Sequence, residues 1–178
     1  NLTVIRPADA TETAQAWHRA IAMNGSPVAL ILSRQKLPIL DVKQTAHGVE
    51  KGGYVLSDCK GKPRIILIAT GAEVHITLKA QAMLADQGIP ARVVSMPSWE
   101  LFEENSTEFK NRILPPAIKH RIAVEAGISM GWERYVGPNG SVIGIDGFGA
   151  SAPGGTVLEK FGFTTGKIVD TALRLLGK

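Results

Sequence analysis

Apolar and polar positions in residues 1–35 follow a pattern that predicts a strand, a helix and a second strand. Residues 2–5 form a short apolar run that Pro7 ends, and residues 28–32 form a continuous apolar run typical of a strand covered on both faces. Between them, Asp9 stands at a helix-cap position, with Glu12 three residues later as in a capping box.

The predicted helix carries apolar residues at helical spacing, which indicates one apolar face: Ala10, Ala14, Trp17 and Ile21. Two strands and one helix do not make a stable core alone. This unit must therefore pack on the rest of the chain or on something outside it.

Residues 36–51 are predicted to be a linker with some structure, because Pro38 interrupts their apolar stretch. A short strand follows at residues 54–57, then a turn at residues 58–63 and a strand at residues 64–69. These two strands are close in sequence, which suggests a hairpin. The turn is too short for a parallel crossover, so they should be antiparallel if they pair.

From residue 64 onward, strands alternate with helices, which predicts a mostly parallel sheet with helices on both faces. The expected strands are 64–69, 91–96, 121–125 and 142–145, and the expected helices are 74–87, within 103–114, around 130–136, 156–161 and 165–176. The predicted fold class is α/β, with a mixed sheet preceded by a βαβ remnant of a second α/β domain. The domains are 1–35, the linker 36–51, and 52–178.

Composition and charge exclude several classes of protein. The 178 residues are 44% hydrophobic and 20% charged, an ordinary globular balance. The net charge is +4, but the Lys and Arg residues are scattered without a run of five, so no nucleic-acid or membrane patch is predicted. No apolar run approaches the roughly 20 residues that span a bilayer.

The metal-ligating residue types are sparse. Cys59 is the single cysteine, which excludes an internal disulfide and fits a reducing cytosol. The four histidines are far apart in sequence, so no metal site is predicted. Because the chain starts at Asn1 and enters an apolar run at once, we expect a piece of a longer protein.

Small and polar residues gather where four predicted strands end, at residues 70–73, 95–98, 125–127 and 146–149. Ligands of open α/β sheets bind outside the carboxyl ends of the strands, so a crevice is expected there. The alternative is that these residues serve only the turns and helix caps.

Arg34 stands at the carboxyl end of the apolar run 28–32. Its guanidinium offers a planar fork suited to a phosphate or carboxylate. The alternative is a surface arginine paired with a nearby acid.

Residues 1–9 and 29–35 closely resemble the end of the pyrimidine-binding domain of transketolase. Residues 52–59, 68–74, 91–97, 124–127 and 148–153 resemble its C-terminal domain in the same order and spacing. Bacterial-type transketolase is the best match, and sister thiamine enzymes fit the string 32–35 and the string 150–153 less well.

The resemblance implies a homodimeric cytoplasmic transferase that moves a two-carbon ketol unit between sugar phosphates. It implies thiamine diphosphate and a divalent metal, magnesium or calcium, as cofactors of the full-length enzyme. The family's cofactor-binding and activating residues precede this segment, so the chain alone is expected to bind no cofactor and to be inactive. Arg34 matches the arginine that grips the substrate phosphate, and no catalytic, cofactor or metal residue maps here.

A second hypothesis from another class is a free-standing small-molecule-binding or regulatory domain that uses the strand-end crevice. The βαβ unit at residues 1–35 favours the enzyme hypothesis, because a self-contained binding module would not need it.

Overall fold

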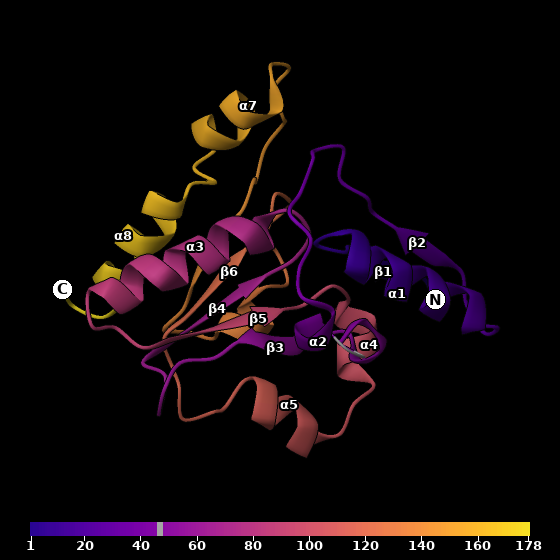
Figure 1. The fold of residues 1–178 in the computed structure, drawn as a ribbon, viewed down its shortest axis with the longest axis horizontal. Coiled ribbons are helices and arrows are strands. Elements are labelled where there is room, and N and C mark those ends of the chain that lie inside the picture. The colour runs from indigo at the N-terminus through magenta and orange to yellow at the C-terminus, as the bar shows by residue number, and fades with distance from the viewer. Residues whose placement is uncertain (46–47) are drawn as a thin grey trace.

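The computed structural model describes residues 1–45 and 48–178 and arranges them in two sheets with helices around them (Figure 1). A two-stranded sheet, β1-β2, belongs to the N-terminal part of the chain. A five-stranded sheet, in the order β3-β5-β4-β6-β7, belongs to the rest. No helix in the described part of the chain is long and apolar enough to cross a membrane.

The N-terminal unit has the predicted strand, helix and strand: β1 (Thr3–Ile5), α1 (Ala10–Ala22) and β2 (Val28–Leu30). The two strands pair in parallel, as a βαβ connection requires. The predicted cap is confirmed, because Oδ1 of Asp9 accepts the backbone N–H of Glu12 at 2.8 Å.

The predicted apolar face of α1 is not the face that packs. Trp17 is 53% exposed and Ile21 is 76% exposed, whereas Glu12 and Ala16 are fully buried. The helix is turned in this way because the Glu12 carboxylate meets hydrogen-bond donors of the second sheet. Sequence periodicity detects the apolar face, but it does not show what lies against it.

The segment predicted as a partly structured linker contains α2 (Val42–Thr45) and a 3₁₀ turn, η1 (Val49–Lys51). Leu40 and Val49 are buried. The backbone N–H of Leu40 donates to Oδ2 of Asp9 at 2.6 Å, which fixes this segment beside the start of α1.

The second sheet is mixed, as predicted. It consists of β3 (Tyr54–Ser57), β4 (Ile65–Ala69), β5 (Ala91–Ser95), β6 (Arg121–Val124) and β7 (Ser141–Ile143). Central strand β4 is parallel to β5 and β6, and β7 is parallel to β6.

The predicted hairpin between β3 and β4 is wrong, because β3 pairs antiparallel with β5 instead. Both edges of β4 are already taken by parallel neighbours, so β3 lies at an outer edge of the sheet, beside β5. The turn after β3 is held there, since Arg92 of β5 binds Asp58 through Nε at 3.1 Å and Nη2 at 2.7 Å.

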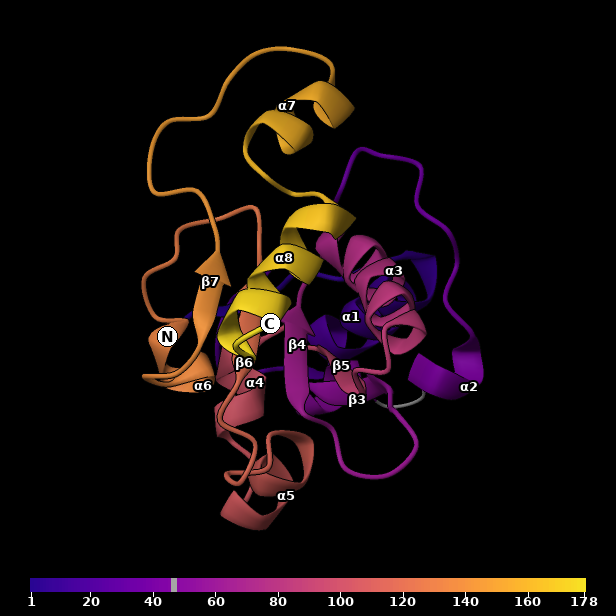
Figure 2. The ribbon, with the colours of Figure 1, turned by 90° about the vertical axis from the view of Figure 1, so that its left-hand side faces the viewer.

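Helices cover both faces of the five-stranded sheet. On one face, α3 (Glu73–Asp86) and α8 (Thr165–Leu175) lie side by side (Figure 2). On the other face lie α4 (Trp99–Glu103), α5 (Thr107–Ile113) and α6 (Glu133–Val136), with Trp132 fully buried among them. Helix α7 (Gly154–Lys160) projects away from the sheet (Figure 1).

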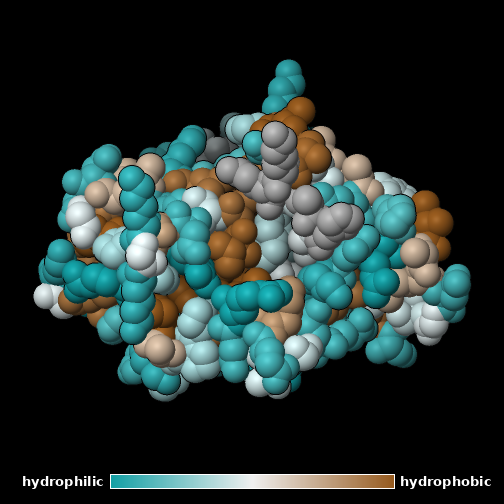
Figure 3. Space-filling model, turned by 60° about the horizontal axis from the view of Figure 1, so that its bottom comes forward, coloured by the Kyte–Doolittle hydropathy of each residue, from teal (hydrophilic) through white to brown (hydrophobic). Residues whose placement is uncertain are grey.

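The core follows from the apolar strands. All five residues of β4 are completely buried, with Ile65 and Leu67 on the α3 side and Ile66 and Ile68 on the α4 side. The surface in Figure 3 is mostly hydrophilic, with apolar side chains exposed in places. The loops that follow the carboxyl ends of the parallel strands lie together at one end of the sheet, beside the N-terminal unit.

Candidate functional site: the strand-end crevice

A crevice of about 410 Å³ lies where the carboxyl ends of the two sheets meet. We call it the strand-end crevice. Three of the four predicted strand-end clusters contribute to it. Its lining is Val4, Arg6 and Ile31 from the N-terminal unit, Thr70 after β4, residues 96–100 after β5, and residues 125–127 after β6.

Arg6 joins the two sheets at this crevice. Directly after β1, its backbone N–H donates to the carbonyl of Pro97 at 2.8 Å, and its carbonyl accepts the hydroxyl of Thr70 at 3.0 Å. Its Nη1 donates to the carbonyl of Thr70 at 2.7 Å and forms an ion pair with Oε2 of Glu73. The Glu73 side chain is only 3% exposed, so this pair is almost dry.

Gly71 allows this close approach. Its φ is +58°, a conformation that favours glycine, and its N–H donates to the Arg6 carbonyl at 3.1 Å. A Cβ atom at this position would lie 2.6 Å from Cζ of Arg6. Residues 70–73 therefore bind and make room for the Arg6 side chain, besides forming a turn.

Two further carboxylates line the strand-end crevice. Glu125 accepts the indole N–H of Trp132 at 2.8 Å, and burial raises the pKa of Glu125, although the Trp132 hydrogen bond and nearby Arg6 partly oppose this. Oε2 of Glu100 accepts the backbone N–H of Val4 at 3.2 Å and the hydroxyl of Ser98 at 3.1 Å. The lining of the crevice therefore holds two carboxyl side chains and one guanidinium.

The fourth predicted cluster, residues 146–149, lines a neighbouring hollow instead, which shares Ala126 and Gly127 with the crevice. Its Asp146 accepts hydrogen bonds from the backbone N–H and the hydroxyl of Ser129, at 2.8 and 2.9 Å. These hydrogen bonds lower the pKa of Asp146.

Behind the Arg6 contact, Glu12 forms a second, fully buried link between the two sheets. Its carboxylate accepts three hydrogen bonds of 2.7 Å, from the Ala8 N–H, the Tyr54 hydroxyl and the Ser95 hydroxyl. Burial raises the pKa of Glu12, although the three donors oppose this. The N-terminal unit thus packs on the rest of the chain, which was one of the two predicted possibilities.

Arg34 lies outside the strand-end crevice. Strand β2 ends at Leu30, four residues before it, and Ile31 is the last residue of this segment to line the crevice. The Arg34 side chain is exposed and has no ion pair or hydrogen bond with residues 1–45 or 48–178. The alternative of a surface ion pair is therefore not found among the described residues.

Sequence reasoning missed Arg6, although the signal was present. Arg6 also follows an apolar strand, so its guanidinium is placed at a strand end just as that of Arg34 is. The described residues include no group of three or more His, Cys, Asp and Glu side chains that could hold a metal ion.

Comparisons with known proteins match both parts of the chain. The family model "Transketolase-like TK C-terminal domain" matches residues 52–164, and "Transketolase, pyrimidine binding domain" matches residues 1–39. Transketolase from Geobacillus stearothermophilus is 49% identical over all of this chain, and the chain spans 27% of that relative's length.

Solved structures of transketolases also match this chain. Transketolase from Leishmania mexicana matches 99% of this chain with a TM-score of 0.89 and 36% identity, over 25% of its own chain. A transketolase complex with sedoheptulose-7-phosphate from Pichia stipitis matches the whole chain with a TM-score of 0.86 and 34% identity, over 26% of its own. With both of its sheets and their order matched in this way, the chain belongs to the transketolase family.

Proposed function

We propose that the chain is the C-terminal part of a thiamine-diphosphate-dependent transketolase that transfers a two-carbon ketol unit between sugar phosphates. One observation carries the proposal. The match to the Leishmania mexicana transketolase covers 99% of the chain in a single superposition with a TM-score of 0.89. The N-terminal unit and the five-stranded sheet, joined by Arg6 and Glu12, therefore have the arrangement of a transketolase.

In this proposal Arg34 binds the phosphate of the substrate. The described residues leave its guanidinium exposed and unpaired, so both edges of its fork are open to an anion. The complex of the Pichia stipitis relative with sedoheptulose-7-phosphate supports a sugar phosphate as the ligand class.

The strand-end crevice does not fit the cofactors that the family implies. The described residues lack a metal-binding cluster. The Arg6 guanidinium in the strand-end crevice is already paired with Glu73, and Glu100 and Glu125 would repel a diphosphate. We propose that thiamine diphosphate and the divalent metal, magnesium or calcium, bind residues of the full-length enzyme outside this chain. The enzyme is proposed to be a cytoplasmic homodimer.

The same proposal assigns residues 1–35 to the end of the pyrimidine-binding domain, 36–51 to a linker and 52–178 to the C-terminal domain. The free-standing binding domain is not favoured, because the match continues through the N-terminal unit.

A chimaera tests the function. The part of the Geobacillus stearothermophilus transketolase that this chain does not cover is fused to residues 1–178 and assayed for ketol transfer with thiamine diphosphate and magnesium. We expect turnover by the chimaera and none by residues 1–178 alone. A folded, dimeric chimaera without turnover, or turnover by the chain alone, would contradict the proposal.

A further inference from the structure

A second pocket, of about 360 Å³, lies at the other end of the five-stranded sheet, where its strands begin. Three segments far apart in sequence form it: residues 62–64 before β4, residues 117–120 before β6, and Leu176 after α8. We call it the basic pocket. Figure 2 looks toward this side, where the C-terminus lies in front of β4 and β6.

Cationic side chains that are far apart in sequence lie together in the basic pocket. Lys62, Arg64 and Lys119 line it together with His120, and none of its lining residues is acidic. Nδ1 of His120 is buried, and it has no hydrogen-bond partner in the described part of the chain. The side chains of the three cations likewise have no ion pair with residues 1–45 or 48–178.

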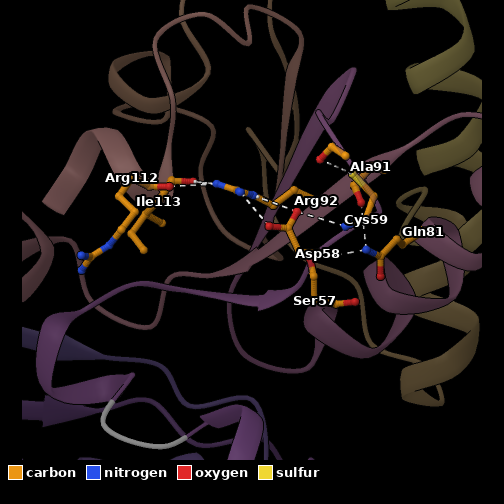
Figure 4. A network of polar contacts seen from close by, with 9 residues as sticks. Ser57, Asp58, Cys59, Gln81, Ala91, Arg92, Arg112 and Ile113 are labelled. Atoms are coloured by element: carbon orange, nitrogen blue, oxygen red, sulfur yellow. Dashed lines mark hydrogen bonds and ion pairs between the residues drawn. The ribbon is translucent and has the colours of Figure 1, made fainter. Parts of the chain in front are cut away.

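The nearest acid along the chain is already occupied. Asp58 belongs to the same loop as Lys62, but both of its oxygens are bound by Arg92 of β5, which also donates to the carbonyls of Arg112 and Ile113 (Figure 4). Arg121, the residue after His120, donates to four backbone carbonyls instead of binding an acid.

The negative end of a helix dipole must be weighed against these cations. The carboxyl end of α8, at Leu175, lies beside the pocket, and a helix end contributes only about −0.5 of an elementary charge. Three full positive charges outweigh it. Unpaired like charges held together repel one another, and an anion that bridges them relieves that repulsion.

We propose that the basic pocket binds a small phosphate-bearing anion with two or more negative charges. Its volume is within the range of small-molecule sites. Arg64 offers a fork for two phosphate oxygens, and the two lysines supply point charges. Pro63, Ile118 and Leu176 give it an apolar wall.

A nucleic acid fits the basic pocket less well. No Phe, Tyr or Trp side chain lines it, and its one ring, the imidazole of His120, is half-buried, so it offers little platform on which a base could stack. The basic pocket contains neither Arg34 nor any residue of the strand-end crevice, so the proposal does not rest on ketol transfer.

Titration calorimetry of the 178-residue chain with pyrophosphate and with inorganic phosphate, at constant ionic strength, tests the proposal. We expect saturable binding of pyrophosphate that is stronger than that of phosphate and that weakens as salt increases. The variant Lys62→Gln/Lys119→Gln should bind pyrophosphate about tenfold more weakly or worse. All three cations are exposed, so the variant should keep its fold, which circular dichroism checks.

The matched control is Lys79→Gln/Lys160→Gln, which removes the same charge from exposed positions on α3 and α7. It should bind pyrophosphate like the parent chain. Equal weakening in both double variants would reduce the effect to net charge and overturn the proposal. So would an absence of pyrophosphate binding, or a short oligonucleotide that binds more tightly and depends on the same two lysines.

Discussion

The hydroxyl of Tyr54 in β3 donates a 2.7 Å hydrogen bond to the carboxylate of Glu12 in α1, across 42 residues of sequence. Oε1 of Glu12 also accepts the hydroxyl of Ser95 in β5, so one oxygen joins the N-terminal unit to two neighbouring strands. Such a buried carboxylate is costly to leave without partners. We therefore expect the two sheets of this chain to unfold together.

Glu12→Gln should lower the stability of the chain. An amide can keep the bonds from Tyr54 and Ser95, but its NH₂ group would face the N–H of Ala8, which now donates to Oε2. We expect a loss of about 1–3 kcal/mol at pH 7 in urea unfolding. Glu159→Gln, at an exposed position on α7, is the control and should change stability little.

The pKa of Glu12 gives this variant a pH signature. Burial raises the pKa in the folded chain above the ordinary value of a glutamate, so the folded state holds the proton more tightly than the unfolded state. The stabilising contribution is complete below about pH 4.5 and is lost as the pH rises through the folded pKa. The margin of the parent chain over Glu12→Gln should therefore shrink with rising pH. If the stability difference between the parent chain and Glu12→Gln instead grew with rising pH, the three hydrogen-bond donors would lower the pKa of Glu12 more than burial raises it.

Gly71→Ala should destabilise the chain more than Gly61→Ala does. Both glycines have a positive φ, +58° and +78°, so both variants strain the backbone by about 1–3 kcal/mol. At Gly61 an added Cβ meets nothing within 4 Å, whereas at Gly71 it lies 2.6 Å from Cζ of Arg6. Urea unfolding should show about 1 kcal/mol or more of additional loss for Gly71→Ala. Equal losses would show that Arg6 moves aside freely.

Arg6→Met should be partly rescued by Glu73→Gln. The single variant leaves the Glu73 carboxylate buried without its cation, which we expect to cost about 2–4 kcal/mol. Glutamine at position 73 removes that charge, and its carbonyl can still accept the N–H of Ala126, now 3.0 Å from Oε2. The double variant should therefore unfold at a higher urea concentration than Arg6→Met. An unchanged or lower midpoint would rule out the charge as the cause.

Most elements could be predicted because their signals are local. Residues 65–69 form an unbroken apolar run, and Asp9 with Glu12 marks the start of α1 within four residues. The pairing of β3 could not be predicted in this way. It depends on which edges of the sheet remain open, and on Arg92 binding Asp58 across 34 residues.

The candidate site was likewise predictable only in part from the sequence. Proximity of the strand-end clusters follows from the parallel sheet, so the crevice was predictable in outline. Which arginine lies in the crevice could not be predicted, because Arg6 and Arg34 both follow apolar strands. Only the folded chain shows that Arg6 reaches Glu73, whereas Arg34 stays exposed. The basic pocket likewise forms from cations that no sequence run joins.

Limited trypsin digestion tests the proposed domain boundaries. Residues 34–36 are exposed and belong to no helix or strand, so the first cleavage should follow Arg34 or Lys36. Lysines on helices, such as Lys79 on α3, should be cut later. Mass spectrometry of the earliest fragments identifies the sites. A first cleavage within residues 64–96 would contradict the assignment of residues 52–178 to one domain.

Arg34→Ala, introduced into the chimaera with the Geobacillus stearothermophilus relative, should raise KM for phosphorylated acceptors and change kcat little. The phosphate is remote from the reacting carbons, so its contact is the same in the ground state and the transition state. A charge-assisted hydrogen bond contributes roughly 1.5–3 kcal/mol, which corresponds to about ten- to a hundredfold in kcat/KM. Arg34→Lys should recover part of this, because an ammonium keeps the charge without the fork. Unphosphorylated acceptors are the control and should be unaffected. Because no hydrogen bond or ion pair joins the exposed Arg34 side chain to residues 1–45 or 48–178, stability should also change little. If both kinds of acceptor were weakened equally, Arg34 would not be the phosphate ligand.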